Sequence, residues 1–329
     1  MTPTPRPHIA APHATVIINA YQQAPTIDLC LHALTRQDYH GPWEIVVTDD
    51  GSTDNCRDIV TRHADTSAIP ITYVRQPHQG NRWARARNLG IQLGRGRILL
   101  MLDGDMIPNL DVVRIHIDEQ RRTPALLAGA RLWRHQPTDL ADTHHPEQQL
   151  HRLHELDQSR DPDCRRREHH EAQLRSTALN SPLPWRAWFG CHASMPALPD
   201  ARYDETMIGW GPVDIELGCR LHHQAALPVR YLPHAQAWHV ERNTGVHNPF
   251  RTGDPIATAN YVRQICHMII RHPDLQLAQA IPIDFDRLLL TDDDTWQIAP
   301  RKTTHPTQTL SRALDWYRRT ALPTNDNHK

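Results

Sequence analysis

Two aspartates, Asp103 and Asp105, follow the apolar run 98–102 and are separated by one glycine. Carboxylates on one turn suit Mg²⁺ or Mn²⁺, and such an ion can neutralise the charge that develops on a leaving diphosphate. The same spacing recurs at 161/163, 284/286 and 292/294, so spacing alone is a weak signal. The preceding apolar run favours the first pair, because it predicts a strand that delivers both side chains to a ligand crevice.

A further carboxylate, Asp50, follows another apolar run in the segment VVTDDGSTD. A carboxylate at the carboxyl end of a strand can accept hydrogen bonds from a base imide or from ribose hydroxyls. Asp49 and Asp50 can also build the turn and cap the next helix, and this second interpretation stays open.

The first 130 residues alternate strands with helices. Apolar runs predict strands at 15–20, 44–48, 69–74, 97–102 and 125–132, and helical spacing predicts helices around 26–37, 54–64, 81–93 and 109–122. Strict alternation predicts an α/β fold in which helices cover a mostly parallel sheet and the ligand crevice lies at the carboxyl ends of the strands.

The remaining chain is less regular. Residues 134–181 are rich in His, Arg and Glu, which predicts an exposed helical excursion whose paired histidines, 144–145 and 169–170, belong to a solvated face. Beyond it we expect helices at about 213–223, 255–271 and 307–319, and two short strands that end near Tyr231 and Trp238.

Composition argues against several classes of protein. The 329 residues include 36 Lys+Arg and 37 Asp+Glu, so there is no global basic field for nucleic acid. Six separated cysteines without a CxxC pair indicate neither a zinc ribbon nor a disulfide framework, and they fit a reducing compartment. Since neither a signal peptide nor a membrane-spanning run is present, we expect a cytoplasmic protein without a transmembrane segment, and peripheral membrane contact stays open.

Five ordered blocks resemble the family 2 glycosyltransferases of the GT-A fold: ATVIINAY, VVTDDGSTD, GNRWARARNLGI, ILLMLDGDM and GWGPVDIELGCRL. The second half is similar to the galactosyltransferase C-terminal type. The resemblance covers about 14–132 and 186–242. It implies a Rossmann-like, mostly parallel sheet with helices on both faces, to which a helical insert and C-terminal helices are added.

The resemblance implies roles in donor binding. Asp50 matches the family aspartate that contacts uracil, and Asn19 and Tyr21 lie on the first-strand loop that faces the nucleoside. Arg87 and Asn88 belong to the ARNxG block, whose helix flanks the diphosphate.

On the acceptor side, GWGPVD resembles the loop whose aspartate is the catalytic base, which makes Asp214 the candidate to take the acceptor proton. Glu216 is the local rival, but on a helix it points about 200° away. Trp210 is expected either to cover a substrate as a lid or to pack in the core. The family block usually reads GWGGED, so Pro212 and Val213 make an acceptor other than the usual glycan more plausible.

The segment AWHVER resembles the strand that supplies a third, histidine ligand for the metal. The resemblance therefore assigns the ion to Asp103, Asp105 and His239, a set that favours Mn²⁺ over Mg²⁺. The turn at Cys191 and His192 takes the place of a family turn that touches the donor sugar, without a nucleophilic role for the thiol.

These observations predict a metal-dependent inverting hexosyltransferase or N-acetylhexosaminyltransferase, which transfers a sugar from a UDP-sugar to a hydroxyl of a glycan, a peptide or a small metabolite. A retaining transferase of the polypeptide GalNAc type and a non-catalytic nucleotide-sugar-binding module are the alternatives, and Asp214 argues against both. The loop AYQQAPT has neither Gly nor Lys, which disfavours nucleotidyl transfer, and a dehydrogenase would need GxGxxG after a strand.

The expected organisation has five parts. They are a flexible N-terminus (1–13), a nucleotide-sugar-binding half (14–133), a charged helical insert (134–181), an acceptor and catalytic half (182–250) and a C-terminal helical region (251–329).

Overall fold

The computed structural model describes residues 11–135, 147–148, 150, 162–241, 253–275, 277, 288–298 and 306–321. Its main sheet contains β1 (Ala14–Ala20), β2 (Trp43–Asp49), β3 (Ile71–Arg75), β4 (Ile98–Asp103), β5 (Met106–Pro108), β6 (Leu126–His135), β7 (His192–Pro196) and β8 (Val229–Glu241). The helices are α1 (Ala24–Leu34), α2 (Cys56–Thr66), α3 (Trp83–Leu93), α4 (Val112–Arg122), α6 (Pro162–Leu179), α7 (Val213–Gln224), α9 (Pro255–Arg271) and α11 (Pro306–Ala321). A hairpin of β9 (Leu288–Leu290) and β10 (Trp296–Ile298) completes the list, with 3₁₀ turns at Pro184–Ala187 and Pro273–Leu275.

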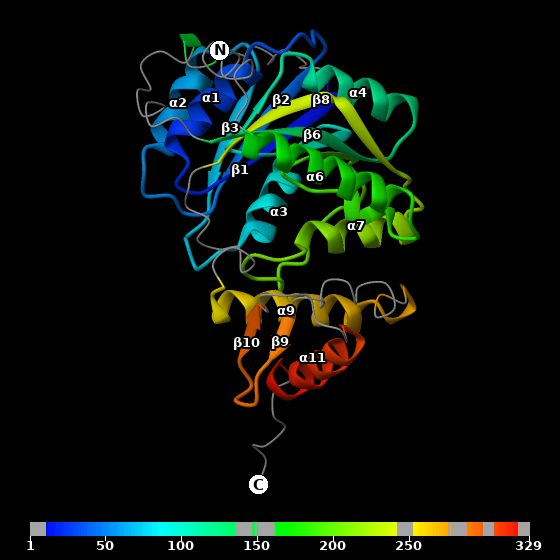
Figure 1. Cartoon of the computed structure of the whole chain (residues 1–329). Coiled ribbons are helices and arrows are strands. Elements are labelled where there is room, and N and C mark those ends of the chain that lie inside the picture. The colour runs from blue at the N-terminus through cyan, green and yellow to red at the C-terminus, as the bar shows by residue number, and fades with distance from the viewer. Residues whose placement is uncertain are drawn as a thin grey trace, which may run out of the picture.

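The sheet has the order β3-β2-β1-β4-β7-β6-β8-β5. The first four strands are mutually parallel, while β7 runs antiparallel to both β4 and β6. Alternate residues of β1 face opposite layers: Val16 and Ile18 join the core that contains α1 and α4, and Ile17 joins the core that contains α7. Helices therefore cover both faces (Figure 1), which confirms the α/β sheet expected from the sequence.

The charged insert differs from the exposed excursion that its composition predicts. Helix α6 buries Glu171 and Arg175 against the sheet, and a carboxylate oxygen of Glu171 lies 2.5 Å from Arg175 and another 2.8 Å from Arg131 of β6. Glu171 is shared by two guanidinium groups, and these contacts offset part of the cost of burying the charges. His169 and His170 are exposed, as expected, whereas His144 and His145 lie outside the described residues.

The two short strands expected near Tyr231 and Trp238 form one strand, β8, which pairs with β6 from Val229 to Glu241. The register shifts between Gly129 and Ala130, so the extra residues of β8 around Pro233 are accommodated without ending the ladder. Local sequence signals a break at this proline, but the partner strand continues across it.

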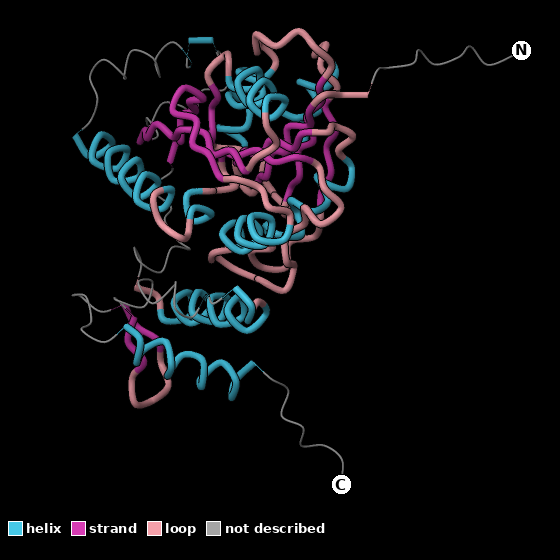
Figure 2. Tube along the Cα trace, turned by 90° about the vertical axis from the view of Figure 1, so that its right-hand side faces the viewer, coloured by secondary structure: helices cyan, strands magenta, loops and turns pink. Residues whose placement is uncertain are grey.

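The C-terminal helices form a unit with the hairpin. Trp296, Trp316 and Ile265 belong to one apolar core, which also includes Trp185 and Cys219 from the sheet-bearing part. Figures 1 and 2 show this unit as a layer beside α7, on the side away from the sheet. Among the described residues, no helix combines the length and apolarity needed to cross a membrane.

Candidate active site

The carboxyl ends of β1, β2 and β4 lie side by side. Asn19 of β1 is in register with Asp103 of β4, and the amide of Asp50 donates to the carbonyl of Ala20 at 2.9 Å. The amide of Gly104 donates to the carbonyl of Asn19 at 2.9 Å. The parallel sheet thus brings together polar residues that are about 80 positions apart in the chain.

One buried arginine joins two of the candidate aspartates. Arg87 of α3 donates from Nη2 to Asp103 Oδ1 at 2.8 Å and from Nη1 to Asp214 Oδ1 at 2.6 Å. The Arg87 side chain is 2% exposed, whereas those of Asp103 and Asp214 are 19% and 21% exposed. Solvent therefore reaches both carboxylates, while the cation between them is buried.

The charges in this group shift its pKa values. Burial raises the pKa of Asp103 above its ordinary value, and Asp105 and Asp214 add to the rise, although Arg87 opposes it. Burial acts against the charge of Arg87, but the carboxylates of Asp214 and Asp103 hold its pKa well above the ordinary value. The guanidinium therefore stays charged.

Asp105 faces a different partner. Its Oδ2 lies 3.5 Å from Nε2 of His239, because β5 and β8 pair antiparallel with Met106 opposite His239. Asp105 Oδ1 and His239 Nδ1 are buried without a hydrogen-bond partner among the residues that the structure describes, as are Asn19 Oδ1 and Gln23 Oε1. Within the same residues, no group of three or more His, Cys, Asp or Glu side chains has the arrangement of a metal site.

Asp50 lies in a buried cradle. Its Oδ1 accepts from Gln76 at 2.5 Å and its Oδ2 from the amide of Arg82 at 3.0 Å. Asp49 has the turn-building role that the sequence left open, since it accepts from the amide of Ser52 at 2.7 Å and from the Tyr73 hydroxyl at 2.5 Å. The two neighbouring aspartates are therefore used differently.

Tyr21 lies at the edge of this cradle. Its ring stacks on that of His78, with centroids 4.4 Å apart and an interplanar angle of 9°. His78 Nδ1 lies 2.9 Å from the carbonyl oxygen of Asp50. His78 and Gln76 were not singled out by the sequence, because they lie on an irregular loop that carries no recognisable motif.

Asn88 holds the loop that contains Tyr203 and Glu205. Its amide nitrogen donates to the carbonyl of Tyr203 and to the carboxylate of Glu205, both at 2.9 Å, and its oxygen accepts from the amide of Tyr203 at 2.8 Å. A contact between Asn88 and the donor stays a prediction. The three hydrogen bonds leave the Asn88 amide with little remaining capacity to bond a ligand.

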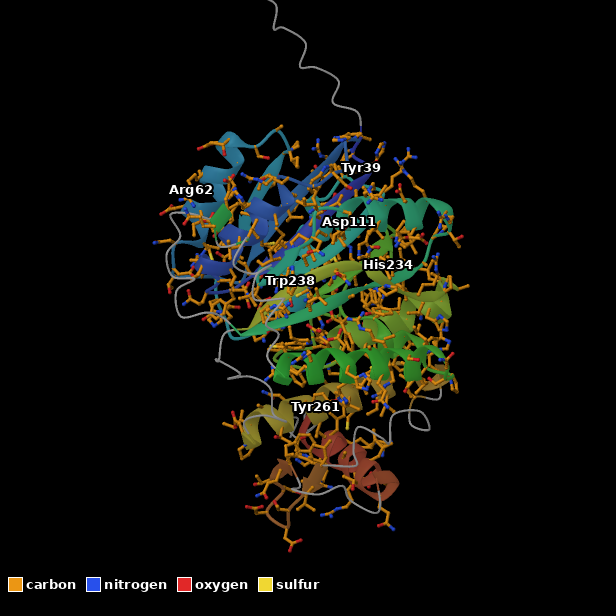
Figure 3. The ribbon with its side chains drawn as sticks, turned by 45° about the horizontal axis from the view of Figure 1, so that its top comes forward. Tyr39, Arg62, Asp111, His234, Trp238 and Tyr261 are labelled. Atoms are coloured by element: carbon orange, nitrogen blue, oxygen red, sulfur yellow. The ribbon has the colours of Figure 1, made fainter. Side chains whose placement is uncertain are left out.

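Trp210 is partly buried and packs against α9, and its expected role as a lid over a substrate stays a prediction. Its ring lies 5.6 Å from that of Tyr261, which Figure 3 labels on α9. Gln264 of α9 donates to the carbonyls of Ile208 and Trp210 at 3.0 and 3.2 Å. This approach requires Gly211, since a Cβ there would lie 2.2 Å from Gln264 Oε1.

Glu216, the rival base, is directed away from Arg87. Its buried carboxylate contacts Arg220 at 2.9 Å and His272 at 2.8 Å. Burial favours its neutral form, but these two partners hold its pKa below the ordinary value. Glu216 therefore connects α7 to α9.

The structure also corrects part of the prediction that the turn at Cys191 and His192 touches the donor sugar. His192 is fully buried, with Nε2 3.3 Å from Nε2 of His116, and burial lowers its pKa to about 3. Cys191 is buried and its sulfur accepts from Arg131 at 3.2 Å. His192 is thus a neutral core residue, because β7 points it into the layer beneath α4 rather than into the crevice.

Known proteins are similar to this chain in sequence. The family model described as Glycosyl transferase family 2 matches residues 15–181. Validoxylamine A glucosyltransferase of Streptomyces hygroscopicus subsp. jinggangensis is 30% identical over 223 residues, which cover 64% of this chain and 51% of the relative. Hyaluronan synthase of Pasteurella multocida is 33% identical over 95 residues, or 29% of this chain and 10% of that protein. The chain spans about half the length of the glucosyltransferase that it matches.

Solved structures share the fold. S. aureus TarS superposes with a TM-score of 0.52 at 17% identity, covering 83% of this chain and 43% of TarS. Mannosyltransferase PcManGT from Pyrobaculum calidifontis gives a TM-score of 0.54 at 19% identity, covering 96% of this chain and 78% of that protein. Similarity of the second half to the galactosyltransferase C-terminal type stays a prediction. Because the family model matches half of the residues of this chain, the chain belongs to glycosyl transferase family 2.

Proposed function

We propose that this chain is a metal-dependent, inverting glycosyltransferase that transfers a sugar from a UDP-sugar to an acceptor hydroxyl. The arrangement of Asp103, Arg87 and Asp214 carries the proposal. It sets one carboxylate at the carboxyl end of β4, where family members bind the donor, beside another at the start of α7.

Asp214 is the proposed base. It lies in the first turn of α7, where the helix dipole favours negative charge, and Arg87 holds its Oδ1. We propose that Oδ2 accepts the acceptor proton as the acceptor oxygen bonds to the anomeric carbon, while the carbon–oxygen bond to the diphosphate breaks and its electron pair leaves with UDP. A single displacement from the opposite side inverts the anomeric configuration.

The donor site would lie along β1 and β2. Asn19 and Tyr21 border the cradle of Asp50, and a base imide would contact Asp50 in exchange for one of its present hydrogen bonds. TarS, solved in complex with UDP-GlcNAc, superposes with a TM-score of 0.50 and supports a uridine donor. PcManGT was solved with GDP-Man, so a guanosine donor is the alternative that a donor assay distinguishes from uridine.

A divalent cation fits the residues present. Asp103, Asp105 and Asp214 bring three negative charges, and Arg87 supplies one positive charge among them. The buried, unpaired Asp105 Oδ1 is an oxygen ligand of the kind that Mg²⁺ and Mn²⁺ take. Asp105 and His239 would hold the ion, with Asp103 beside them, and the PcManGT complex with Mn²⁺ supports this choice. When bound, the ion would neutralise charge on the leaving diphosphate.

The relatives do not restrict the class of acceptor, because they include a validoxylamine A glucosyltransferase and a hyaluronan synthase. A glycan, a peptide and a small metabolite all remain within the proposal. Pro212 and Val213 shape the start of α7 next to the proposed base, so acceptor specificity is expected to depend on this turn.

UDP release from a panel of UDP-sugars, with Mn²⁺ or with EDTA, tests the proposal. We expect Mn²⁺-dependent release from one donor, lowered roughly 10²–10⁴-fold in Asp214→Asn with UDP binding retained. Asp118→Asn, on the exposed face of α4, is the matched control. Binding of a donor without turnover with any acceptor would indicate the non-catalytic binding module, and retention of anomeric configuration in the product would indicate the retaining alternative.

A further inference from the structure

We propose that Arg87 is a positioning residue, which fixes the carboxylate of Asp214 by sharing one guanidinium between Asp214 and Asp103. This inference rests on the proposed function, because it explains how the proposed base is held. It also differs from the role that the resemblance implies for Arg87, which is to flank the diphosphate.

The contact geometry uses both terminal nitrogens of the guanidinium. Nη1 donates to Asp214 and Nη2 to Asp103, at 2.6 and 2.8 Å. A guanidinium is a rigid planar fork, so the position of one carboxylate determines where the other can lie. A lysine ammonium is a point charge and cannot reproduce this constraint.

The surroundings restrict Arg87 further. The guanidinium lies 5.3 Å from the centre of the Tyr203 ring, and the next residue, Asn88, holds the backbone of Tyr203. Because Arg87 is 2% exposed, it has little room to turn toward a ligand in the crevice. Its two carboxylate partners are the members of this group that solvent reaches.

Gly190 forms the opposite wall around Asp214. A Cβ at this position would lie 2.3 Å from Asp214 Oδ1 and 2.7 Å from the Tyr203 hydroxyl. The same oxygen that Arg87 holds is therefore enclosed from a second side. A glycine is required here because the carboxylate occupies the space of a side chain.

The shared cation connects the donor side of the crevice to the acceptor side. Asp103 ends β4, and Asp214 lies in the first turn of α7, more than 100 residues later. A change that displaces Asp103 therefore also removes a restraint on Asp214. We expect the cost of such changes to appear in the rate of transfer more than in donor binding.

Arg87→Lys is the first test. We expect kcat for UDP release and transfer to fall about 10²-fold, as for a misplaced reacting group, while the KM for the donor changes less than about threefold. Arg122→Lys, which makes the same change in an exposed ion pair, is the control and should retain full kcat. UDP binding by calorimetry and the melting temperature establish that the variant is folded.

A double mutant separates positioning from a general structural effect. If Arg87 acts through Asp214, Arg87→Lys should have no further effect on the residual turnover of Asp214→Asn. Gly190→Ala, which displaces Asp214 from the other side, should lower kcat with Arg87 intact, and it decides the question if Arg87→Lys does not fold.

Three results overturn the inference. A raised donor KM with unchanged kcat in Arg87→Lys would make Arg87 a donor ligand. Additive losses in the double mutant would show that Arg87 acts independently of Asp214. Absence of turnover in the wild-type chain with every UDP-sugar and acceptor would overturn the proposed function and this inference together, whereas an active wild type with an equally active Arg87→Lys overturns only the inference.

Discussion

Asp103 and Asp105 are equivalent in the sequence but not in the structure. Both lie at the carboxyl end of β4, yet Asp103 is bound to Arg87 and Asp105 faces His239. The difference arises because α3 approaches the end of β4 on one side and β8 pairs with β5 on the other. A motif of two aspartates therefore contains two different sites, which spacing alone cannot separate.

This difference predicts unequal effects on metal binding. Asp105→Asn and His239→Gln should each weaken Mn²⁺ binding to the protein by about 10- to 100-fold, because each removes a ligand of the proposed ion. Asp103→Asn should weaken it less, since its carboxylate is held by Arg87. Mn²⁺ titration followed by electron paramagnetic resonance measures this without turnover.

His234→Gln provides the control for these variants, because His234 lies on the same strand as His239 but is exposed. It should leave Mn²⁺ binding unchanged. Equal losses in Asp103→Asn and Asp105→Asn would show that both carboxylates ligate the ion and that the contact with Arg87 does not persist when it binds.

At the scale of elements, the bounds of the four mutually parallel strands, β1 to β4, could be predicted from the sequence to within about two residues. All seven residues of β1 and of β2 are buried, and each strand has a central apolar run, at 16–18 and 45–47, instead of the alternation of a half-exposed strand. The role of α6 could not be predicted, because Glu171 pairs with Arg131 at a separation of 40 residues. A composition that indicates a solvated helix does not reveal partners that only the fold supplies.

Glu171 is therefore expected to be important for stability. Glu171→Gln would leave Arg131 and Arg175 buried without their shared anion, and should lower the free energy of unfolding by about 3–5 kcal/mol. Urea unfolding followed by circular dichroism measures this loss. Asp315→Asn, in an exposed pair with Arg318, should cost less than about 1 kcal/mol.

The same carboxylate predicts a dependence of stability on pH. Burial alone would raise the pKa of Glu171, but Arg131 and Arg175 lower it to about 2. Because the folded pKa is below the ordinary value of 4.5, the contribution is complete above pH 4.5 and is lost as the pH falls toward 2. Unfolding midpoints measured across this range should fall more steeply for wild type than for Glu171→Gln.

At the scale of the whole molecule, the C-terminal unit supports the loop that leads to Asp214. Two side chains of α9 and the residue that follows it reach the sheet-bearing part: Gln264 bonds the carbonyls around Trp210, His267 lies 3.0 Å from Asp204, and His272 lies 2.8 Å from Glu216. These contacts converge on residues 204–216. The sequence predicted α9 within its observed bounds, but the face that it presents depends on contacts more than 50 residues away.

Gln264→Ala tests whether this support affects activity. The substitution leaves the carbonyls of Ile208 and Trp210 without their donor, which should lower stability by about 1–3 kcal/mol and loosen the turn before Asp214. UDP-sugar turnover should then fall while UDP binding is retained, because the donor cradle at Asp50 lies on other loops. Gln297→Ala, on an exposed position of β10, should change neither quantity. Full turnover in a destabilised Gln264→Ala protein would show that α9 stabilises the chain without setting the position of the base.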